Sequence, residues 1–308
     1  IADIVADLAD LAAADGPVDL AVDFAARLPL EVWSVVLDLP AGDLGVFAER
    51  LWRLQRGTGW GPADRLDART AFDELVAMID PLFDTRRSDP GDDLISAIAQ
   101  LELADGPPTA ADVVATVFEA DHETLHGGLA NLWWLLVMKP DQLERVRNEP
   151  LLMKFAWLEA LRHSPPVQSA ERFARHEVER FGRLLPEGAL LHLSAVAANR
   201  DPRVFSDPDE FIVGRHDLCQ REPRGQYRAD GLPSGIAFGL GRPSLHPAVP
   251  KERPRSRYAI TRDIAVAASS ALLDAFPALH LADGAEPTIR SLRLGEMATC
   301  WHLPVHLR

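Results

Sequence analysis

Three residues near the middle of the chain have the types and the spacing of a zinc hydrolase site. His122 and His126 stand four residues apart, and Glu123 lies between them in the pattern His-Glu-x-x-His. On a helix these two histidines share a face, so they could bind Zn²⁺ while the glutamate acts as the general base. A third protein ligand would have to come from elsewhere, and Glu144 is a candidate without further support.

A second pair of residues could form an ion pair on a helix. Glu159 and Arg162 stand three residues apart, a spacing that places both side chains on one helical face. Taken alone, the pair is typical of a surface contact worth roughly a few tenths of a kcal/mol. The role of the pair is structural whether it lies on the surface or is buried.

Helices must position most of these residues. Apolar residues repeat at helical spacing through residues 1–165, and Pro and Gly separate the segments. Thr109 and Asp112 resemble a capping box, and the apolar-rich stretch after them runs to Met138. This stretch predicts one continuous helix of roughly 45 Å, which must be mostly buried.

The second part of the chain has a different pattern of predicted secondary structure. Residues 166–308 mix loops, short strands and a helix, with predicted strands at Val167–Arg175, Val178–Arg180, Ala189–Leu193 and, paired, within Ile289–Leu307. Nothing repeats internally. We therefore predict one domain, residues 1–308, that is mainly α with a minor β region.

Composition excludes several classes of function. The chain has 308 residues and a formal net charge of −14, which argues against binding to nucleic acids or anionic membranes. Two cysteines, Cys219 and Cys300, exclude a disulfide scaffold and a four-thiolate metal site. The longest nearly apolar run, Leu129 to Met138, is too short to span a bilayer. We expect a protein without a secretory leader, and therefore a cytoplasmic one.

Four local patterns follow one another in a fixed order. They are Ala120-Asp121-His122-Glu123-Thr124, then Glu159-Ala160-Leu161-Arg162 with Pro165-Pro166-Val167, then Ala198-Asn199-Arg200-Asp201-Pro202 leading to Arg215, and last Ala237-Phe238-Gly239-Leu240-Gly241-Arg242-Pro243. Together they resemble the bacterial cytochrome P-450 superfamily of haem-thiolate monooxygenases. The resemblance covers essentially the whole chain and implies the fold of that family without its N-terminal portion.

The resemblance gives roles to the residues of the second and third patterns. In the family, the glutamate and arginine of one helix and an arginine of a later loop form a buried ion network that locks the fold. Glu159, Arg162 and Arg215 match these three positions. A buried structural network is therefore expected in place of a surface pair.

The first pattern resembles the oxygen-activation segment of the family. An acid and a threonine relay protons there, and Glu123 and Thr124 match them. Asp121 stands where the family usually has glycine, and its carboxylate would project into the space for oxygen and substrate. We interpret Asp121, Glu123 and Thr124 as vestiges of that segment.

The last pattern departs from the family at the iron ligand. Phe238, Gly239 and Gly241 fit the haem loop, but Leu245 stands where the axial cysteine must be. A leucine side chain has no lone pair and cannot coordinate iron, whereas haem-thiolate chemistry depends on the sulfur. The sequence therefore predicts a vestigial loop, no cofactor and no metal.

Two alternatives stay open. His246, displaced by one position from the cysteine site, could ligate haem without a thiolate and support a monooxygenase-like enzyme. The zinc hydrolase using His122, Glu123 and His126 is the other. The resemblance accounts for His122 and Glu123 without a metal, which leaves His126 as the unexplained part of the motif.

One branch of the superfamily lacks the axial cysteine and binds no haem. It comprises the P-450-like auxiliary proteins that accompany deoxysugar glycosyltransferases in macrolide and anthracycline biosynthesis. The resemblance to this branch implies a pseudoenzyme rather than an enzyme. It also implies that the chain binds a desosaminyl-type glycosyltransferase and activates or stabilises it.

Overall fold

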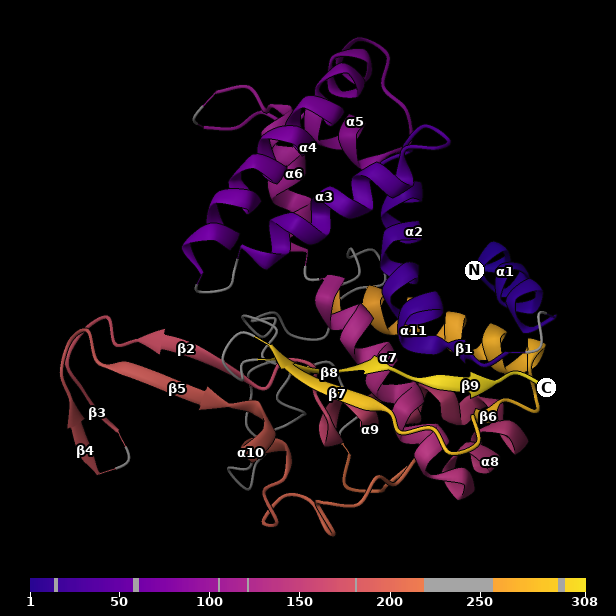
Figure 1. Ribbon diagram of the computed structural model, residues 1–308. Coiled ribbons are helices and arrows are strands. Elements are labelled where there is room, and N and C mark those ends of the chain that lie inside the picture. The colour runs from indigo at the N-terminus through magenta and orange to yellow at the C-terminus, as the bar shows by residue number, and fades with distance from the viewer. Residues whose placement is uncertain are drawn as a thin grey trace. The chain divides into compact units, whose positions relative to one another are not determined.

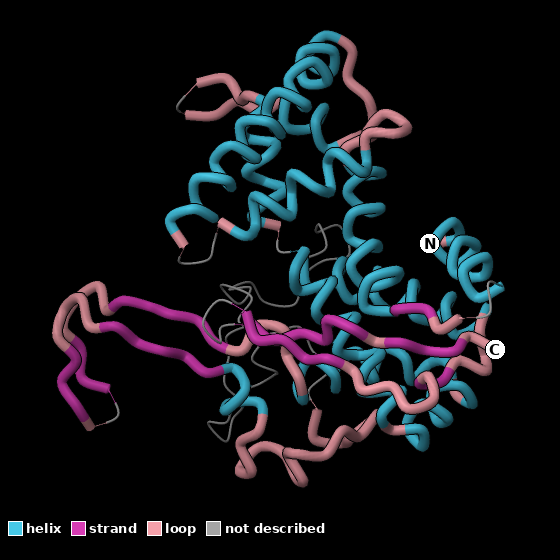
Figure 2. Tube along the Cα trace, viewed as in Figure 1, coloured by secondary structure: helices cyan, strands magenta, loops and turns pink. Residues whose placement is uncertain are grey.

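The computed structural model describes residues 1–13, 16–57, 61–104, 106–120, 122–180, 182–218, 257–292 and 297–308. In these residues the chain is mainly helical with a minor β region, which confirms the predicted fold class (Figures 1 and 2). The helices are α1 (Ala2–Ala13), α2 (Arg27–Val36), α3 (Leu44–Arg56), α4 (Pro62–Ser88), α5 (Leu94–Ala99), α6 (Ala110–Glu119), α7 (His122–Met138), α8 (Pro140–Asn148), α9 (Met153–His163), α10 (Ala195–Asn199) and α11 (Arg257–Ala275). A π-helical segment, η1 (Leu20–Ala26), and a 3₁₀ turn, η2 (Pro150–Leu152), complete the set.

The described strands are short and pair antiparallel. They are β1 (Val18–Asp19), β2 (Ser169–Phe173), β3 (Val178–Arg180), β4 (Arg183–Leu185), β5 (Leu190–Ser194), β6 (His280–Leu281), β7 (Thr288–Leu292), β8 (Met297–His302) and β9 (Pro304–His306). β9 lies between β1 and β6 in a three-stranded sheet, and β2–β5, β3–β4 and β7–β8 form two-stranded sheets. The predicted strand runs are thus confirmed, with ends that differ by one or two residues.

Contacts divide the chain into two compact units. One consists of residues 26–122, and the other combines residues 1–25 with 123–308. The sequence predicts one domain, and each unit is described below by itself.

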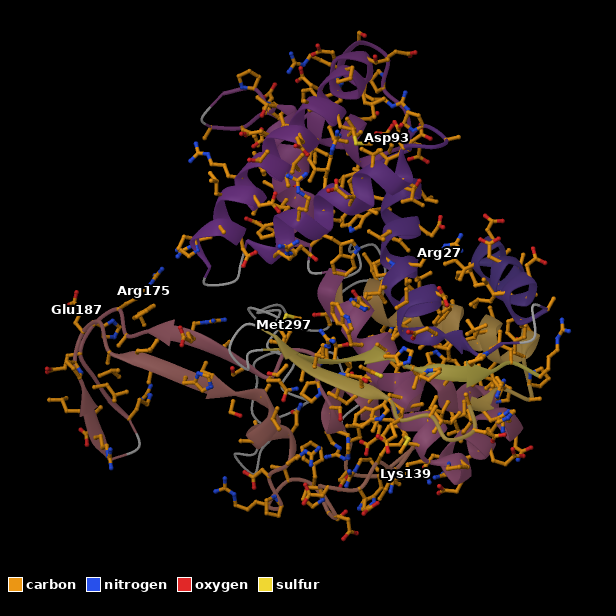
Figure 3. All side chains as sticks on the ribbon, in the orientation of Figure 1. Arg27, Asp93, Lys139, Arg175, Glu187 and Met297 are labelled. Carbon is orange, nitrogen blue, oxygen red and sulfur yellow. The ribbon has the colours of Figure 1, made fainter. Side chains whose placement is uncertain are left out.

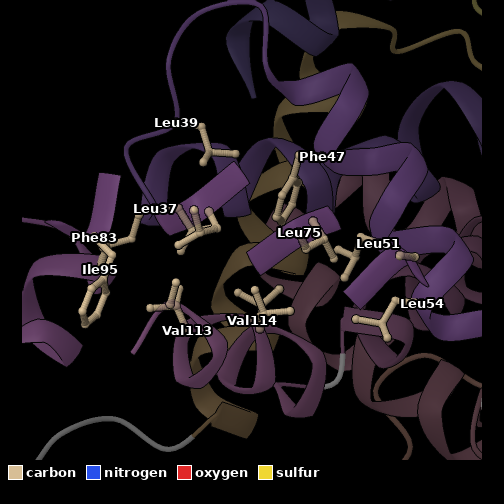
Figure 4. Close-up of a cluster of buried hydrophobic side chains, with 14 of the residues drawn as sticks. Leu37, Leu39, Phe47, Leu51, Leu54, Leu75, Phe83, Ile95, Val113 and Val114 are labelled. Carbon is tan, nitrogen blue, oxygen red and sulfur yellow. The ribbon is translucent and has the colours of Figure 1, made fainter. Parts of the chain in front are cut away.

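The unit of residues 26–122 is built around an apolar core between helices. α3 and α4 pack along each other, and α4 also packs against α5 and α6. Their apolar side chains recur at helical spacing, which gives each helix one buried face. Figure 4 shows part of this core, whose fully or nearly fully buried members include Leu37, Phe47, Leu51, Leu75, Ile79, Phe83, Ile95, Val113 and Val117.

The other unit is centred on α7. Side chains around the whole circumference of this helix are buried, among them Leu129, Leu132, Trp133 and Leu136. A helix that is apolar on all sides belongs in a core. The Phe24 ring of η1 packs edge-on against Trp133, with ring centroids 6.4 Å apart.

The prediction of one continuous helix from Thr109 to Met138 is wrong. α6 ends at Glu119, and a separate helix, α7, begins at His122. The last turn of α6 tightens, because the Ala120 N–H donates to the carbonyl of Val117 three residues back at 3.3 Å. The ladder of four-residue hydrogen bonds therefore stops there. The sequence at the break, Glu119 to Thr124, is mostly polar, and this interruption of the apolar pattern is the local signal that the prediction of one helix overlooked.

The beginning of α6 follows the prediction. The Thr109 N–H donates to the Asp112 carboxylate at 2.7 Å, which confirms the capping box. Within the part of the chain that is described, no helix is long and apolar enough to cross a membrane.

Two hairpins of the unit that contains residues 123–308 form a ribbon. β2 and β5 pair along their whole length, and β3 and β4 continue from their far ends. Arg175 and Glu187, labelled in Figure 3, lie at the bend between the two hairpins. Apolar side chains on the ribbon face solvent: Phe173, Leu184, Leu190 and Leu193 are each more than half exposed.

Candidate functional site

The predicted oxygen-activation segment lies where α6 gives way to α7. Thr124 is buried in the first turns of α7. Residue 121 and the side chains of His122 and Glu123 lie outside the described residues. Of the predicted proton relay, the structure therefore describes the backbone of Glu123 and Thr124 and the side chain of Thr124.

Two glycines after this segment let α7 approach its neighbours closely. A Cβ on Gly128 would lie 2.5 Å from the Trp157 ring of α9, and one on Gly127 would lie 2.7 Å from Pro166. Real Cβ atoms do not approach so closely, so a side chain at either position would push the elements apart. Gly128 therefore lets α7 pack closely on α9, and Gly127 lets it pack closely on Pro166, in the segment that follows α9.

His126, the second histidine of the zinc motif, is buried in α7. Burial lowers the pKa of its imidazole from 6.5 to about 4, so the ring stays neutral at neutral pH. Its ring lies 6.2 Å from that of Trp301 on β8. Among the described residues, no three His, Cys, Asp or Glu side chains gather as a metal site would require. His126 is accounted for by packing in the core of this unit.

The sequence analysis missed a polar residue that ties this core together. Asn131 is buried on α7, where its amide donates to the carbonyls of Ser164 and Ala298 at 2.8 and 3.1 Å. Its side-chain oxygen accepts from the Cys300 N–H at 2.8 Å. One amide thus joins α7 to the end of α9 and to β8. A lone polar residue within an apolar run was the signal that could have found it, since buried polar groups are normally hydrogen-bonded.

The structure brings Glu159, Arg162 and Arg215 together. Glu159 and Arg162 are fully buried on α9, and Arg215 is 7% exposed. The Arg162 guanidinium donates to both carboxylate oxygens of Glu159 at 2.8 Å, in the bidentate geometry of a strong ion pair. Arg215 adds a hydrogen bond to the same carboxylate at 3.2 Å.

Backbone groups complete this network. Arg162 donates to the carbonyls of Asn199, Pro208 and Glu210 at 3.0, 2.6 and 2.8 Å. The Ile212 N–H donates to Glu159 at 2.9 Å. The loop that follows α10 is thereby fastened to α9 through the buried side chains of Arg162 and Glu159.

Arg215 is held by a second carboxylate. Its Nε donates to Asp217 at 2.6 Å. Burial raises the pKa of Asp217, but hydrogen bonds from Arg215 and Ser206 outweigh this effect and lower it to about 2. Asp217 therefore keeps its negative charge beside Arg215 at any pH near neutrality. The network lies on one side of α9 and includes no exposed reactive group.

The predicted haem loop lies outside the described residues. Phe238, Gly239, Gly241, Leu245 and His246 all fall within residues 219–256. Their assignment rests on the sequence, and His246 as an iron ligand gains no support. Cys219 falls in the same segment.

A thiolate-bound haem does not fit the donors that are described. Cys300 is buried on β8, and burial raises the pKa of its thiol to about 12. Its Sγ lies 3.5 Å from the carbonyl of His302, to which it donates. A thiol held protonated in this way is a poor metal ligand. Among the described residues, Cys300 therefore provides no thiolate for iron.

Comparison with known proteins decides the family. The chain is 31% identical to the 6-deoxyerythronolide B hydroxylase of Saccharopolyspora erythraea, over 99% of this chain and 69% of that protein. The chain belongs to the cytochrome P450 family. The family model for cytochrome P450 matches residues 93–242 and so ends just before the position of Leu245.

Further P450 relatives agree. The monooxygenase PikC of Streptomyces venezuelae is 33% identical over 79% of this chain and 57% of its own length. The fold matches the solved structure of the cytochrome P450 PksS of Bacillus subtilis, with a TM-score of 0.77 and 23% identity over 99% of this chain and 72% of that one. The chain thus spans a little over half to about three quarters of the P450 proteins it resembles.

The prediction that this chain is not an enzyme is wrong at the level of its family. Its relatives are named as hydroxylases and monooxygenases, and both are classes of enzyme. The prediction had rested on the identity of a single loop residue, Leu245, which weighs less than relatedness along nearly the whole chain. The resemblance to the haem-free auxiliary branch is a finer statement than these comparisons support.

Proposed function

We propose that this P450-family protein takes part in the biosynthesis of a macrolide, where it binds a desosaminyl-type glycosyltransferase and activates or stabilises it. One observation carries the proposal. By the resemblance of the loop that begins at Phe238, Leu245 stands where the family has its axial cysteine, in a chain that aligns along 99% of its length with the 6-deoxyerythronolide B hydroxylase of Saccharopolyspora erythraea. The relative's name supports the biosynthetic setting, and the replaced ligand supports a task in partner binding.

Two physical effects could link binding to transferase activity. A protein that binds the folded transferase and not the unfolded chain stabilises it by mass action. A protein that prefers one conformation of the transferase raises the population of that conformation through its differential affinity. The first effect lengthens the life of the transferase, and the second raises its rate from the first turnover.

Hydroxylation of a macrolide-type substrate is the second candidate. The names of two relatives, a 6-deoxyerythronolide B hydroxylase and a monooxygenase, favour it. A haem would supply the oxygen activation, but the donors described above do not fit a thiolate-bound haem. This candidate therefore rests on relatedness to these enzymes.

A pair of measurements separates the two candidates. The chain is expressed with excess haem precursor, and its absorption is recorded from the Soret region to 700 nm. It is then titrated into a deoxysugar glycosyltransferase while glycoside formation is followed. For the proposal we expect a glycosylation rate that rises and saturates at a fixed ratio of the two proteins. A transferase that neither binds the chain nor responds to it would overturn the proposal.

A single variant sharpens the comparison. Leu245→Cys restores the sulfur that the family resemblance implies. If the ligand alone is missing, this variant should acquire a Soret band that the unaltered chain lacks, and its effect on the transferase should persist. A stoichiometric Soret band and a hydroxylated product from the unaltered chain would favour the second candidate.

A further inference from the structure

Two histidines face each other across the C-terminal sheet. β6 pairs antiparallel with β9, and the register places His280 directly opposite His306. Directly opposite residues of an antiparallel pair point to the same side of the sheet. Val305, the neighbour of His306, is fully buried, so alternation turns the two histidines toward the other face. His280 is exposed there and His306 is half-buried.

The tautomer of His280 is fixed by a backbone group. Its Nδ1 lies 2.8 Å from the carbonyl oxygen of Ala278. A carbonyl oxygen can only accept, so Nδ1 carries the proton and donates it. The lone pair of the neutral ring is therefore on Nε2. Histidines that bind metals characteristically donate their other ring nitrogen to a carbonyl or carboxylate in this way, which orients the ring.

The spacing of the two rings suits coordination of a single ion. Their centroids are 5.5 Å apart, and the ring planes are inclined by 42°. Metal–nitrogen bonds of about 2.0 Å at a tetrahedral angle would place two imidazole centroids about 5 Å apart. A shift of a few tenths of an ångström, within the freedom of an exposed side chain, brings the rings to that separation.

We propose that His280 and His306 form a bis-imidazole site for a divalent transition-metal ion. Imidazole nitrogens suit Cu²⁺, Ni²⁺ and Zn²⁺, and Cu²⁺ binds such donors most tightly. Among the described residues no larger ligand group is present, so water occupies the remaining positions on the ion. The site is distinct from the predicted haem loop and from the zinc motif on α7, and it would cross-link β6 to β9.

Nearby charge limits the affinity of this site. The Arg147 guanidinium of α8 donates to the carbonyl of Leu279, the residue before His280. A cation at this distance opposes a second positive ion, whereas the net charge of −14 favours it over a longer range. Protons compete with the metal for the imidazole nitrogens, so binding weakens as the solution is acidified.

The test is a titration of the tag-free chain with Cu²⁺ at pH 7.5, followed by electron paramagnetic resonance and by calorimetry. We expect one tight ion per chain with hyperfine splitting from two nitrogens. Either His280→Asn or His306→Asn should weaken this ion at least tenfold and remove one nitrogen from the spectrum. His176→Asn, which alters an exposed histidine in the bend of the ribbon, is the matched control and should change neither.

Stability gives a second readout that does not depend on both variants folding. An ion that joins two strands of the native sheet raises the midpoint of thermal unfolding. Zn²⁺, which is redox-inactive, should raise it for the unaltered chain and for His176→Asn, and leave it unchanged for His280→Asn. Tight binding that survives in His280→Asn, or that His176→Asn abolishes, would overturn the proposal.

Discussion

Replacing Arg162 by methionine should remove a large part of the stability of the unit that contains it. The methionine keeps much of the apolar volume of the side chain but none of its donors. Glu159 would then be a fully buried carboxylate whose bidentate partner is gone, with Arg215 and one backbone N–H remaining. The carbonyls of Asn199, Pro208 and Glu210 would lose the same donor.

The magnitude follows from these losses. Breaking a buried ion pair by removing one partner costs about 3–5 kcal/mol. An unsatisfied buried carbonyl costs about 1–3 kcal/mol, although water can reach some of these groups once the side chain is shortened. We therefore expect Arg162→Met to lower the free energy of unfolding by roughly 4 kcal/mol or more, against a total of about 5–15 kcal/mol for a typical domain. Arg162→Lys should rescue little of this, because an ammonium group cannot reproduce the planar fork.

Urea unfolding followed by tryptophan fluorescence and by far-ultraviolet circular dichroism measures the effect. Trp157, on the same helix and buried, reports on this unit. The control is Arg203→Met, which removes an exposed arginine paired with Asp201 in the neighbouring loop. It should leave the urea midpoint unchanged, since exposed ion pairs contribute little. Equal midpoints for Arg162→Met and Arg203→Met would refute the reasoning that the buried network holds the loop after α10.

Three further predictions follow from buried groups. His126 has a pKa of about 4 in the folded chain and 6.5 when unfolded, so on acidification the unfolded chain binds the proton first. The free energy of unfolding should therefore fall by roughly 3 kcal/mol as the pH drops from 6.5 to 4, and His126→Leu should flatten this part of the curve of stability against pH. Gly128→Ala should lower the urea midpoint because its Cβ would lie 2.5 Å from Trp157, whereas Gly45→Ala, which meets nothing within 4 Å, should preserve or raise it. In a Cys219→Ser background, Cys300 should react with a thiol reagent only as fast as the chain opens, because its pKa is about 12; rapid reaction of the native protein would contradict this.

The ion network shows what spacing and chemistry can predict. Two residues three apart must share a helical face, so the pairing of Glu159 with Arg162 follows from the sequence once the helix is assigned. Their burial does not follow, because it depends on a loop that returns from residues 199–215 to cover them. The family resemblance supplied that non-local information.

The helix break and the histidine pair are features that the sequence analysis did not predict. Apolar periodicity reports which face of a helix is buried, and it does not report where the hydrogen-bond ladder stops. The polar run from Glu119 to Thr124 stands between the apolar stretches of α6 and α7 and was the local signal of the break. His280 and His306 lie far apart in the sequence and become neighbours only through the register of β6 on β9. A register shift of one residue would turn one ring to the opposite face of the sheet, and no local pattern specifies that alignment.

Asn131 connects these observations to the proposed function. If the core around α7 were held by apolar contacts alone, leucine could replace Asn131 with little loss of stability. Its three hydrogen bonds instead fix α7 to the end of α9 and to β8, and therefore set the position of the ion network relative to the C-terminal strands. A buried polar network whose members are all hydrogen-bonded makes a core rigid and specifies one arrangement of it. A partner that recognises the surface of this chain needs that surface to keep a defined shape. We therefore expect a glycosyltransferase to respond less to the Arg162→Met variant than to the unaltered chain.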